Sequence, residues 1–214
     1  MKVLIACEES QTVCKAFRAR GHEAYSCDIQ EPSGGHPEWH ILGDALKAIH
    51  GGQVTTMDGQ THDVGRWDLM IAHPPCTKTS NAGARWLYRG GKLDLERYYQ
   101  GLCGKALFLE LWAAQIERVV IENPRPSKIF GFPEPTQVIQ PWQFGDPYTK
   151  ETLLWERGVP QLEPANIVES IATWCPSSKK DKRGHGMFTT DRAKNRAKTF
   201  PGIAAAMAEQ WGNL

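Results

Sequence analysis

Two segments of the chain carry side chains that could act together on a bound molecule. The apolar run at residues 67–72 stops at the tetrapeptide HPPC, whose last residue is Cys76. The apolar run at 118–121 stops at the tripeptide ENP, whose first residue is Glu122. A thiolate is a strong nucleophile, and a carboxyl group in a pocket can give or hold a proton. The pattern therefore predicts a nucleophile and an acid–base group, each at the end of a buried strand.

Prolines follow both of these strands. Because proline fixes φ and lacks an N–H group, neither strand can continue past it. Ligands of open α/β sheets bind outside the carboxyl ends of the strands, so we expect Cys76 and Glu122 on one rim. Lys78 and Arg85 are positive neighbours that could activate the thiol. Taken alone, each residue has a plainer interpretation, a buried inert cysteine and a polar strand exit.

The surrounding pattern predicts an α/β fold in one domain. We expect buried strands at 2–6, 22–28, 67–72 and 118–122, and helices at 10–20, 93–115 and 202–211. Ser10 is the expected N-cap of the first helix and Gly21 its end. Weaker strand patterns at 136–142 and 152–155 flank a turn, and 157–198 is expected to be mostly loop. A strand–helix–strand opening is typical of a parallel sheet.

Composition narrows the class of protein. The 214 residues suit one domain, and no run approaches the ~18 apolar residues of a membrane span. The first strand begins directly at the N-terminus without a signal peptide, which favours a cytoplasmic protein. Six scattered cysteines indicate reduced thiols. The pairs His36/His40 and Cys175/His185 lack the spacing of a zinc site, so no metal is expected.

These segments resemble motifs of the cytosine-5 DNA methyltransferases. PPCTKTSNAG (74–83) is similar to the family's Pro-Cys motif with its following Ser and Ala-Gly, and ENP (122–124) to its Glu-Asn-Val motif. FGDPYTKETLLW (144–155) is similar to its Tyr-Gly-x-Pro-Gln-x-Arg-x-Arg block, and 196–212 to its last helix. The resemblance spans nearly the whole chain, and it is greatest for small phage and prophage cytosine-methylase-like proteins. It implies a Rossmann-like sheet of the class I methyltransferase type.

The resemblance implies a specific chemistry. Cys76 would add to ring carbon 6 of cytosine while Glu122 protonates or holds ring nitrogen 3, and S-adenosylmethionine would methylate carbon 5. Asn123, Lys150 and Thr152 would hold the ring.

Cofactor contacts are implied around the first strand–helix turn and the start of the nucleophile loop. The expected residues are Ala6, Cys7, Glu8, Asp28, Ile29, Asp44, Ala45, His73 and Pro74. Asp28 fits the acidic residue that binds ribose hydroxyls, and an Asx turn is the less favoured alternative. The turn, ACEESQT (6–12), departs from the family because it has no glycine. Glu8 could instead bond the amino group of the cofactor.

DNA is the implied partner. We expect a catalytic core at 1–155, an irregular basic segment at 156–198 and a C-terminal helix at 199–214 that packs back on the core. The basic segment is too short for the family's target-recognition domain, but it could hold phosphates. An aromatic and basic stretch after Cys76, with Gly90-Gly91 as a mobile element, could clamp nucleic acid. The expected contacts are Lys78, Arg85, Arg89, Lys92, Lys179, Lys180, Lys182, Arg183, Lys194 and Arg196.

Three functions remain open from the sequence. The first is cytosine-5 methylation of DNA, either a duplex with a flipped base or a single strand. The second is the same chemistry on a free nucleotide, or with a modified donor. The third is a non-catalytic nucleic-acid-binding protein on a methyltransferase scaffold.

Overall fold

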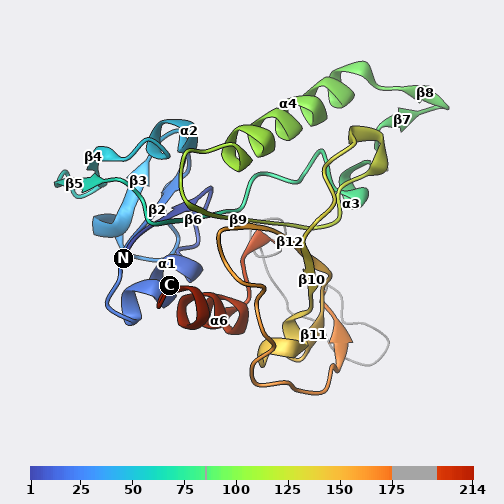
Figure 1. Cartoon of the computed structure of the whole chain (residues 1–214). Coiled ribbons are helices and arrows are strands. Elements are labelled where there is room, and N and C mark those ends of the chain that lie inside the picture. Colours follow the sequence, from blue (N-terminus) through green and yellow to red (C-terminus); the bar gives the residue numbers. More distant parts are fainter. Residues whose placement is uncertain (85, 175–196) are drawn as a thin grey trace.

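The computed structural model describes residues 1–84, 86–174 and 197–214 (Figure 1). Within these ranges, a seven-stranded sheet has the order β3-β2-β1-β6-β9-β12-β10. Its strands are β1 (Lys2–Ala6), β2 (Glu23–Asp28), β3 (His40–Leu42), β6 (Leu69–Ala72), β9 (Arg118–Asn123), β10 (Gln137–Ile139) and β12 (Thr152–Arg157). The five strands from β3 to β9 run parallel, and β12 is antiparallel to both β9 and β10.

The central strands are apolar because both of their faces are covered. On one face, alternate residues such as Val3 and Ile5 pack with the helices α1 (Thr12–Ala19) and α6 (Pro201–Trp211). On the other face, their neighbours pack with α2 (Ala45–Ala48) and α4 (Leu95–Trp112). Figure 1 shows α4 on one side of the sheet and α1 with α6 on the other. The C-terminal helix thus contributes to the core.

Smaller elements lie in the connections between the strands and helices of this sheet. They are the hairpins β4 (Gly52–Thr55)/β5 (Thr61–Gly65) and β7 (Tyr88–Arg89)/β8 (Lys92–Leu93), the parallel pair β11 (Tyr148–Thr149)/β13 (Ala172–Thr173), α3 (Asn81–Ala84), and the 3₁₀ turns η1 (Pro37–Trp39), η2 (Lys128–Phe130) and η3 (Pro141–Phe144).

The Rossmann-like α/β fold predicted from the sequence is confirmed. Two local predictions are wrong. Ser10 is not the N-cap of the first helix, which begins after Gln11. The segments predicted as a turn and a loop contain β11 and β13, which pair across more than twenty residues of sequence. In the described ranges, no helix combines the length and the apolar composition that a membrane crossing requires.

Candidate functional site

Cys76 just after β6 and Glu122 near the end of β9 lie at the same edge of the sheet, because β6 and β9 are parallel neighbours. Ala72, the last residue of β6, pairs with Ile121 of β9. Cys76 lies four residues beyond that pair and is half-buried, and Glu122 lies one residue beyond it and is buried. The parallel alignment therefore brings both residues to the carboxyl edge, where ligands of such sheets bind.

Backbone hydrogen bonds fasten the loop after β6 (73–80, the Cys76 loop) to the loop after β9 (124–127). The Asn81 N–H, just beyond the Cys76 loop, donates to the Arg125 carbonyl at 3.1 Å, and the Ser127 N–H donates to the Thr79 carbonyl at 2.8 Å. The buried side-chain amide of Asn123 donates to the Pro74 carbonyl at 3.2 Å. The two loops form one connected unit, and Asn123 holds them together.

A tight turn follows Cys76. Its carbonyl accepts hydrogen bonds from the N–H groups of Thr79, at 3.2 Å, and Ser80, at 2.9 Å. The backbone of Gly83 packs directly on that of Thr77, where a Cβ atom would overlap the Thr77 carbonyl oxygen. The glycine of the Ala-Gly pair is therefore required by the close approach of α3 to the Cys76 loop.

A buried histidine contacts the carboxylate. The Nδ1 atom of His73 lies 3.0 Å from the Oε2 atom of Glu122, and the two side chains are only 9% and 8% exposed. Burial lowers the pKa of His73, but the hydrogen bond to Glu122 and the charges of Glu122 and Glu8 outweigh it and raise that pKa above its usual value. Burial raises the pKa of Glu122, yet His73 and the charge of Lys150 bring it below its usual value. Both shifts act in the direction of a protonated imidazole beside an ionised carboxylate.

Lys150 and Thr152 reach this edge because β12 is antiparallel to β9 and therefore begins where β9 ends. The charge of Lys150 influences both His73 and Glu122. Thr152 is buried, and its hydroxyl donates to the Lys150 carbonyl at 3.1 Å. The structure thus gathers the five residues predicted to act on the ring at one end of β6, β9 and β12.

The turn after β1 contains no glycine, and two non-glycine residues adopt the left-handed conformation in it. Cys7 and Gln11 adopt left-handed backbone conformations, with φ of 58° and 57°. The buried carboxylate of Glu8 accepts hydrogen bonds from the N–H groups of Val13, at 2.7 Å, and Cys14, at 3.2 Å. Burial raises the pKa of Glu8, opposed by the charge of His73 and these two bonds. Glu8 therefore satisfies two N–H groups of the first turn of α1, and the Ser10 hydroxyl accepts a longer bond from the Thr12 N–H at 3.5 Å.

Two further carboxylates lie beside this turn. Asp28 ends β2 and accepts a hydrogen bond from the Gln30 N–H at 2.9 Å, so the Asx turn is present. Asp44 caps α2 by accepting from the Leu46 N–H at 2.9 Å. Burial, followed by the charges of Asp28 and Asp44, raises the pKa of Cys7 to about 12. Cys7 and both carboxylates are therefore neighbours, and the Cys7 thiol stays protonated.

The remaining residues predicted to bind cofactor divide into buried and exposed ones. Ala6, Ala45 and Pro74 are buried. Ile29, directly after Asp28, is 79% exposed although it is a large apolar residue. An exposed apolar side chain next to a carboxylate is a suitable support for an apolar ring.

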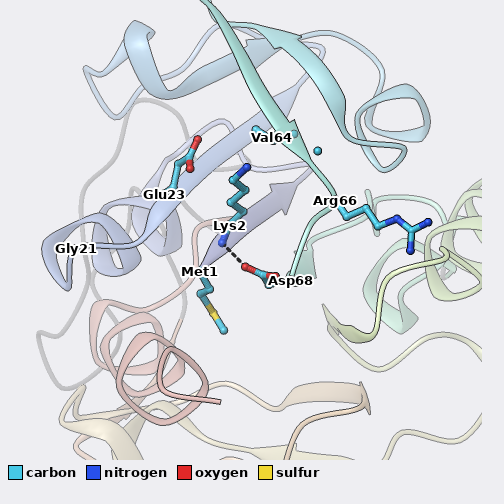
Figure 2. A pocket seen from close by; sticks show the side chains of 8 residues that line it. Met1, Lys2, Gly21, Glu23, Val64, Arg66 and Asp68 are labelled. Atoms are coloured by element: carbon cyan, nitrogen blue, oxygen red, sulfur yellow. Dashed lines mark hydrogen bonds between the residues drawn. The ribbon is translucent and has the colours of Figure 1, made fainter.

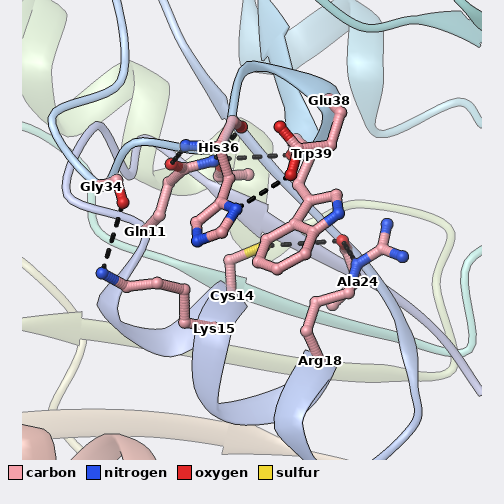
Figure 3. Close-up of polar contacts among 10 residues, drawn as sticks. Gln11, Cys14, Lys15, Arg18, Ala24, Gly34, His36, Glu38 and Trp39 are labelled. Atoms are coloured by element: carbon pink, nitrogen blue, oxygen red, sulfur yellow. Dashed lines mark hydrogen bonds and ion pairs between the residues drawn. The ribbon is translucent and has the colours of Figure 1, made fainter.

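Sequence reasoning missed a loop that crosses the turn after β1 (Figure 3). The Ser33 N–H donates to the Glu9 carbonyl at 2.8 Å. The buried side chain of Gln11 donates to the His36 carbonyl at 2.8 Å and accepts from the His36 N–H at 3.1 Å. The His36 ring stacks on Trp39 with centroids 3.8 Å apart. Gln11 thereby fixes the outer wall of the turn, and no local sequence signal indicates this pairing.

The predicted nucleic-acid contacts are placed only in part. Lys78 lies half-buried in the Cys76 loop, and Arg89 and Lys92 are exposed on the β7–β8 hairpin, which projects beyond the N-terminal end of α4 (Figure 1). Tyr88 and Tyr99 are 57% and 67% exposed in the same region. Seven further predicted contacts lie outside the described residues, namely Arg85, Lys179, Lys180, Lys182, Arg183, Lys194 and Arg196.

The open pocket of Figure 2 lies at the opposite edge of the sheet. Met1, Lys2 and Asp68 line it, and the Lys2 N–H donates to the Asp68 carboxylate at 2.6 Å. These residues precede β1 and β6 or begin them, so the pocket is far from the strand ends that carry Cys76 and Glu122. Among the described residues, no group of three or more acidic, histidine or cysteine side chains is arranged to hold a metal ion.

Comparisons with known proteins find similar solved structures but no matching family. No protein-family model matches the chain, and no curated protein matches it. One similar solved structure is described as a DNA modification methyltransferase encoded within a prophage (E. coli), with a TM-score of 0.45 and 14% sequence identity. The match covers 79% of this chain and 52% of that one, so this chain spans about half the length of that structure. So distant a likeness says nothing about chemistry, which has to be inferred from the residues of the site.

Proposed function

We propose that the protein transfers a methyl group from S-adenosylmethionine to carbon 5 of cytosine in DNA, through a covalent bond to Cys76. One observation carries this proposal. A half-buried cysteine just after β6 and a buried carboxylate near the end of the adjacent parallel strand β9 lie at one edge, and backbone hydrogen bonds join the loops that follow the two strands. An attack on the unsaturated ring requires a thiol and a hydrogen-bonding carboxyl group that face the same ring edge.

The proposed reaction uses the side chains at this edge in sequence. The Cys76 thiolate forms a bond to ring carbon 6, and the electron pair of the carbon 5–carbon 6 double bond becomes available at carbon 5. Glu122 stabilises the ring by a hydrogen bond at nitrogen 3. S-adenosylmethionine, when bound, would supply an electrophilic methyl group to carbon 5 and leave as S-adenosylhomocysteine. A water molecule then takes the carbon 5 proton, and the double bond re-forms as the sulfur–carbon 6 bond breaks and the thiolate leaves.

The residues around the first turn fit a cationic nucleoside cofactor. The carboxylates of Asp28 and Asp44 and the exposed side chain of Ile29 lie at the end of β2 and the start of α2. A dinucleotide would fit poorly, because its pyrophosphate binds at the helix N-terminus. Here the carboxylate of Glu8 already accepts hydrogen bonds from the N–H groups of that helix turn. Asp28 would hold the ribose hydroxyls and Ile29 would support the adenine.

DNA is the proposed substrate because the β7–β8 hairpin and the start of α4, which follow the Cys76 loop in the chain, combine exposed aromatic and basic side chains. Tyr88 and Tyr99 offer stacking faces, and Arg89 and Lys92 offer positive charge. Arg89 also contacts Asp94 at 3.3 Å, which anchors the hairpin at the start of α4. A flipped or unpaired base could enter the site while its neighbours contact this surface.

Methyl transfer and covalent trapping test the proposal together. The protein is incubated with methyl-labelled S-adenosylmethionine and either duplex DNA, single-stranded DNA or deoxycytidine monophosphate. We expect label in DNA, and a covalent adduct at Cys76 when the DNA contains 5-fluorocytosine. Cys76→Ser should abolish both, whereas Cys103→Ser, which alters an exposed cysteine in α4, should leave both intact. Label that appears only in the mononucleotide would replace DNA as the substrate, and the absence of any transfer by folded protein would sink the proposal.

The glycine-free turn favours a second candidate function, a nucleic-acid-binding protein that has lost its cofactor. Its left-handed residues are Cys7 and Gln11, which pay a conformational cost that glycine would not. Calorimetric titration with S-adenosylmethionine separates the two functions. Tight DNA binding without any heat of cofactor binding would favour the second.

A further inference from the structure

The buried imidazole of His73 has a single hydrogen-bonding partner on its ring among the described residues. Its Nδ1 atom lies 3.0 Å from the Oε2 atom of Glu122, and its Nε2 atom is buried without a hydrogen bond to any described residue. The His73 N–H donates to the Ala6 carbonyl at 2.9 Å, which fixes the backbone between β1 and β6. The ring is therefore oriented by Glu122, and Glu122 by the ring.

Three ionisable groups act on His73 from three parts of the fold. Glu122 lies at the end of β9, Glu8 in the turn after β1, and Lys150 just before β12. The two carboxylates favour the imidazolium and the ammonium group opposes it. Because Glu8 is already bonded to the helix N-terminus, Glu122 is the group that is free to share a proton with His73. A buried carboxylate without such a partner would take up a proton instead.

We propose that His73 is a positioning residue that keeps Glu122 ionised. Its imidazole holds the Oε2 atom of Glu122 in a hydrogen bond, so that the carboxylate presents its other oxygen to the pyrimidine. This inference rests on the proposed function, and it decides between two roles for Glu122. Glu122 accepts hydrogen bonds from the cytosine amino group and from nitrogen 3, which takes up a proton from water when Cys76 adds, and Glu122 does not donate a proton of its own. The histidine before the two prolines thereby sets the chemistry of a residue 49 positions away.

Two substitutions separate the hydrogen bond of His73 from its charge. In His73→Asn the side-chain amide can replace the Nδ1 donor but carries no charge, and in His73→Leu both are lost. The pKa of Glu122 is followed in the protein without ligands by carbon-13 NMR of its carboxyl group. An opposite charge beside a carboxylate typically shifts its pKa by roughly 1–3 units, so we expect a rise of that size in His73→Leu and a smaller one in His73→Asn.

Covalent trapping on 5-fluorocytosine DNA gives the functional readout. The rate of adduct formation is measured against pH. In His73→Leu, the acidic limb of this profile should move to higher pH by the same amount as the pKa of Glu122, and the adduct rate at neutral pH should fall roughly tenfold or more. His73→Asn should restore most of that rate. A merely structural histidine would lower the rate at every pH and leave the limb in place.

The reciprocal measurement guards against a variant that fails to fold. In Glu122→Gln, the pKa of the His73 ring, followed by nitrogen-15 NMR, should fall because the carboxylate charge is gone. Unchanged titration of Glu122 in folded His73→Asn, together with unchanged titration of His73 in Glu122→Gln, would overturn the inference. If the unmodified protein forms no adduct while both titrations shift as expected, the proposed function fails and the coupling of the pair stands.

Discussion

Gly83 offers the sharpest test of how the Cys76 loop is held. A Cβ atom at this buried position of α3 would overlap the Thr77 carbonyl oxygen and lie 2.9 Å from the Thr77 carbonyl carbon. Ordinary contact begins at 3.4 Å, so Gly83→Ala must move one backbone segment by at least about 0.5 Å (3.4 − 2.9 Å). Neither segment can yield by a simple rotamer change, because the atoms in the way belong to the backbone.

This displacement should reach the thiol. Cys76 directly precedes Thr77, and the turn that follows is closed by hydrogen bonds to the Cys76 carbonyl. A misplacement of ~1 Å can cost about 100-fold in rate, so a shift of at least half that size should cost roughly tenfold or more. Overpacking of a buried site should also lower the free energy of unfolding by about 1–3 kcal/mol.

Two rates measure the effect. One is adduct formation on 5-fluorocytosine DNA, and the other is alkylation of Cys76 by iodoacetamide, followed by mass spectrometry, which requires no assumption about function. Gly104→Ala is the matched control. Its Cβ atom would lie 3.2 Å from a methyl group of Thr79, in the same loop, where a side chain can give way. If the Gly83→Ala variant keeps both rates and the free energy of unfolding of the unmodified protein, the reasoning is refuted.

Three further outcomes follow from the structure. Glu8→Ala leaves two helix N–H groups without their acceptor, so the free energy of unfolding should fall by about 2–4 kcal/mol in urea denaturation, and Glu8→Gln should lose less; equal losses would contradict the capping role. The lowered pKa of Glu122 contributes stability above the usual value of 4.5, and this contribution is lost as the pH falls through the lowered pKa. The raised pKa of His73 contributes stability below the usual value of 6.5, and this contribution is lost as the pH rises through the raised pKa. Stability relative to His73→Asn should therefore be greatest between these values, and a flat difference across pH would exclude the ion pair. Tyr88→Ala and Tyr99→Ala should each weaken binding of single-stranded DNA by ~1–3 kcal/mol in fluorescence anisotropy without slowing Cys76 alkylation; undiminished binding would rule out stacking there.

Local chemistry was enough to place the thiol and the carboxylate at strand ends. The apolar runs before Cys76 and Glu122 are long enough for buried strands, and the prolines that follow forbid their extension. The helix predicted at 93–115 is observed at Leu95–Trp112, because the Asp94 side chain caps its first turn by accepting from the Arg97 N–H at 3.0 Å. Such signals lie within a few residues of each other, so the sequence alone carries them.

Other features depend on contacts that no local pattern encodes. Ser10 has the residue type of an N-cap, yet the left-handed Gln11 is the residue that precedes the helix, and the Glu8 carboxylate accepts from the N–H groups of Val13 and Cys14. The pairing of β11 with β13 joins segments that read as irregular, since two-residue strands have no periodicity to detect. Long-range pairing overrides local preference wherever the local preference is weak.

The sequence by itself determined the fold class, the four central strands of the sheet and the two residues that the proposed chemistry needs. The tertiary structure alone decided that β6 and β9 are neighbours, that their loops are bonded together, and that His73 meets Glu122. The physical reason is that strand order and side-chain pairing arise from burial of the whole sheet between two helical layers. A histidine beside two prolines shows its partner only once the strands are placed side by side.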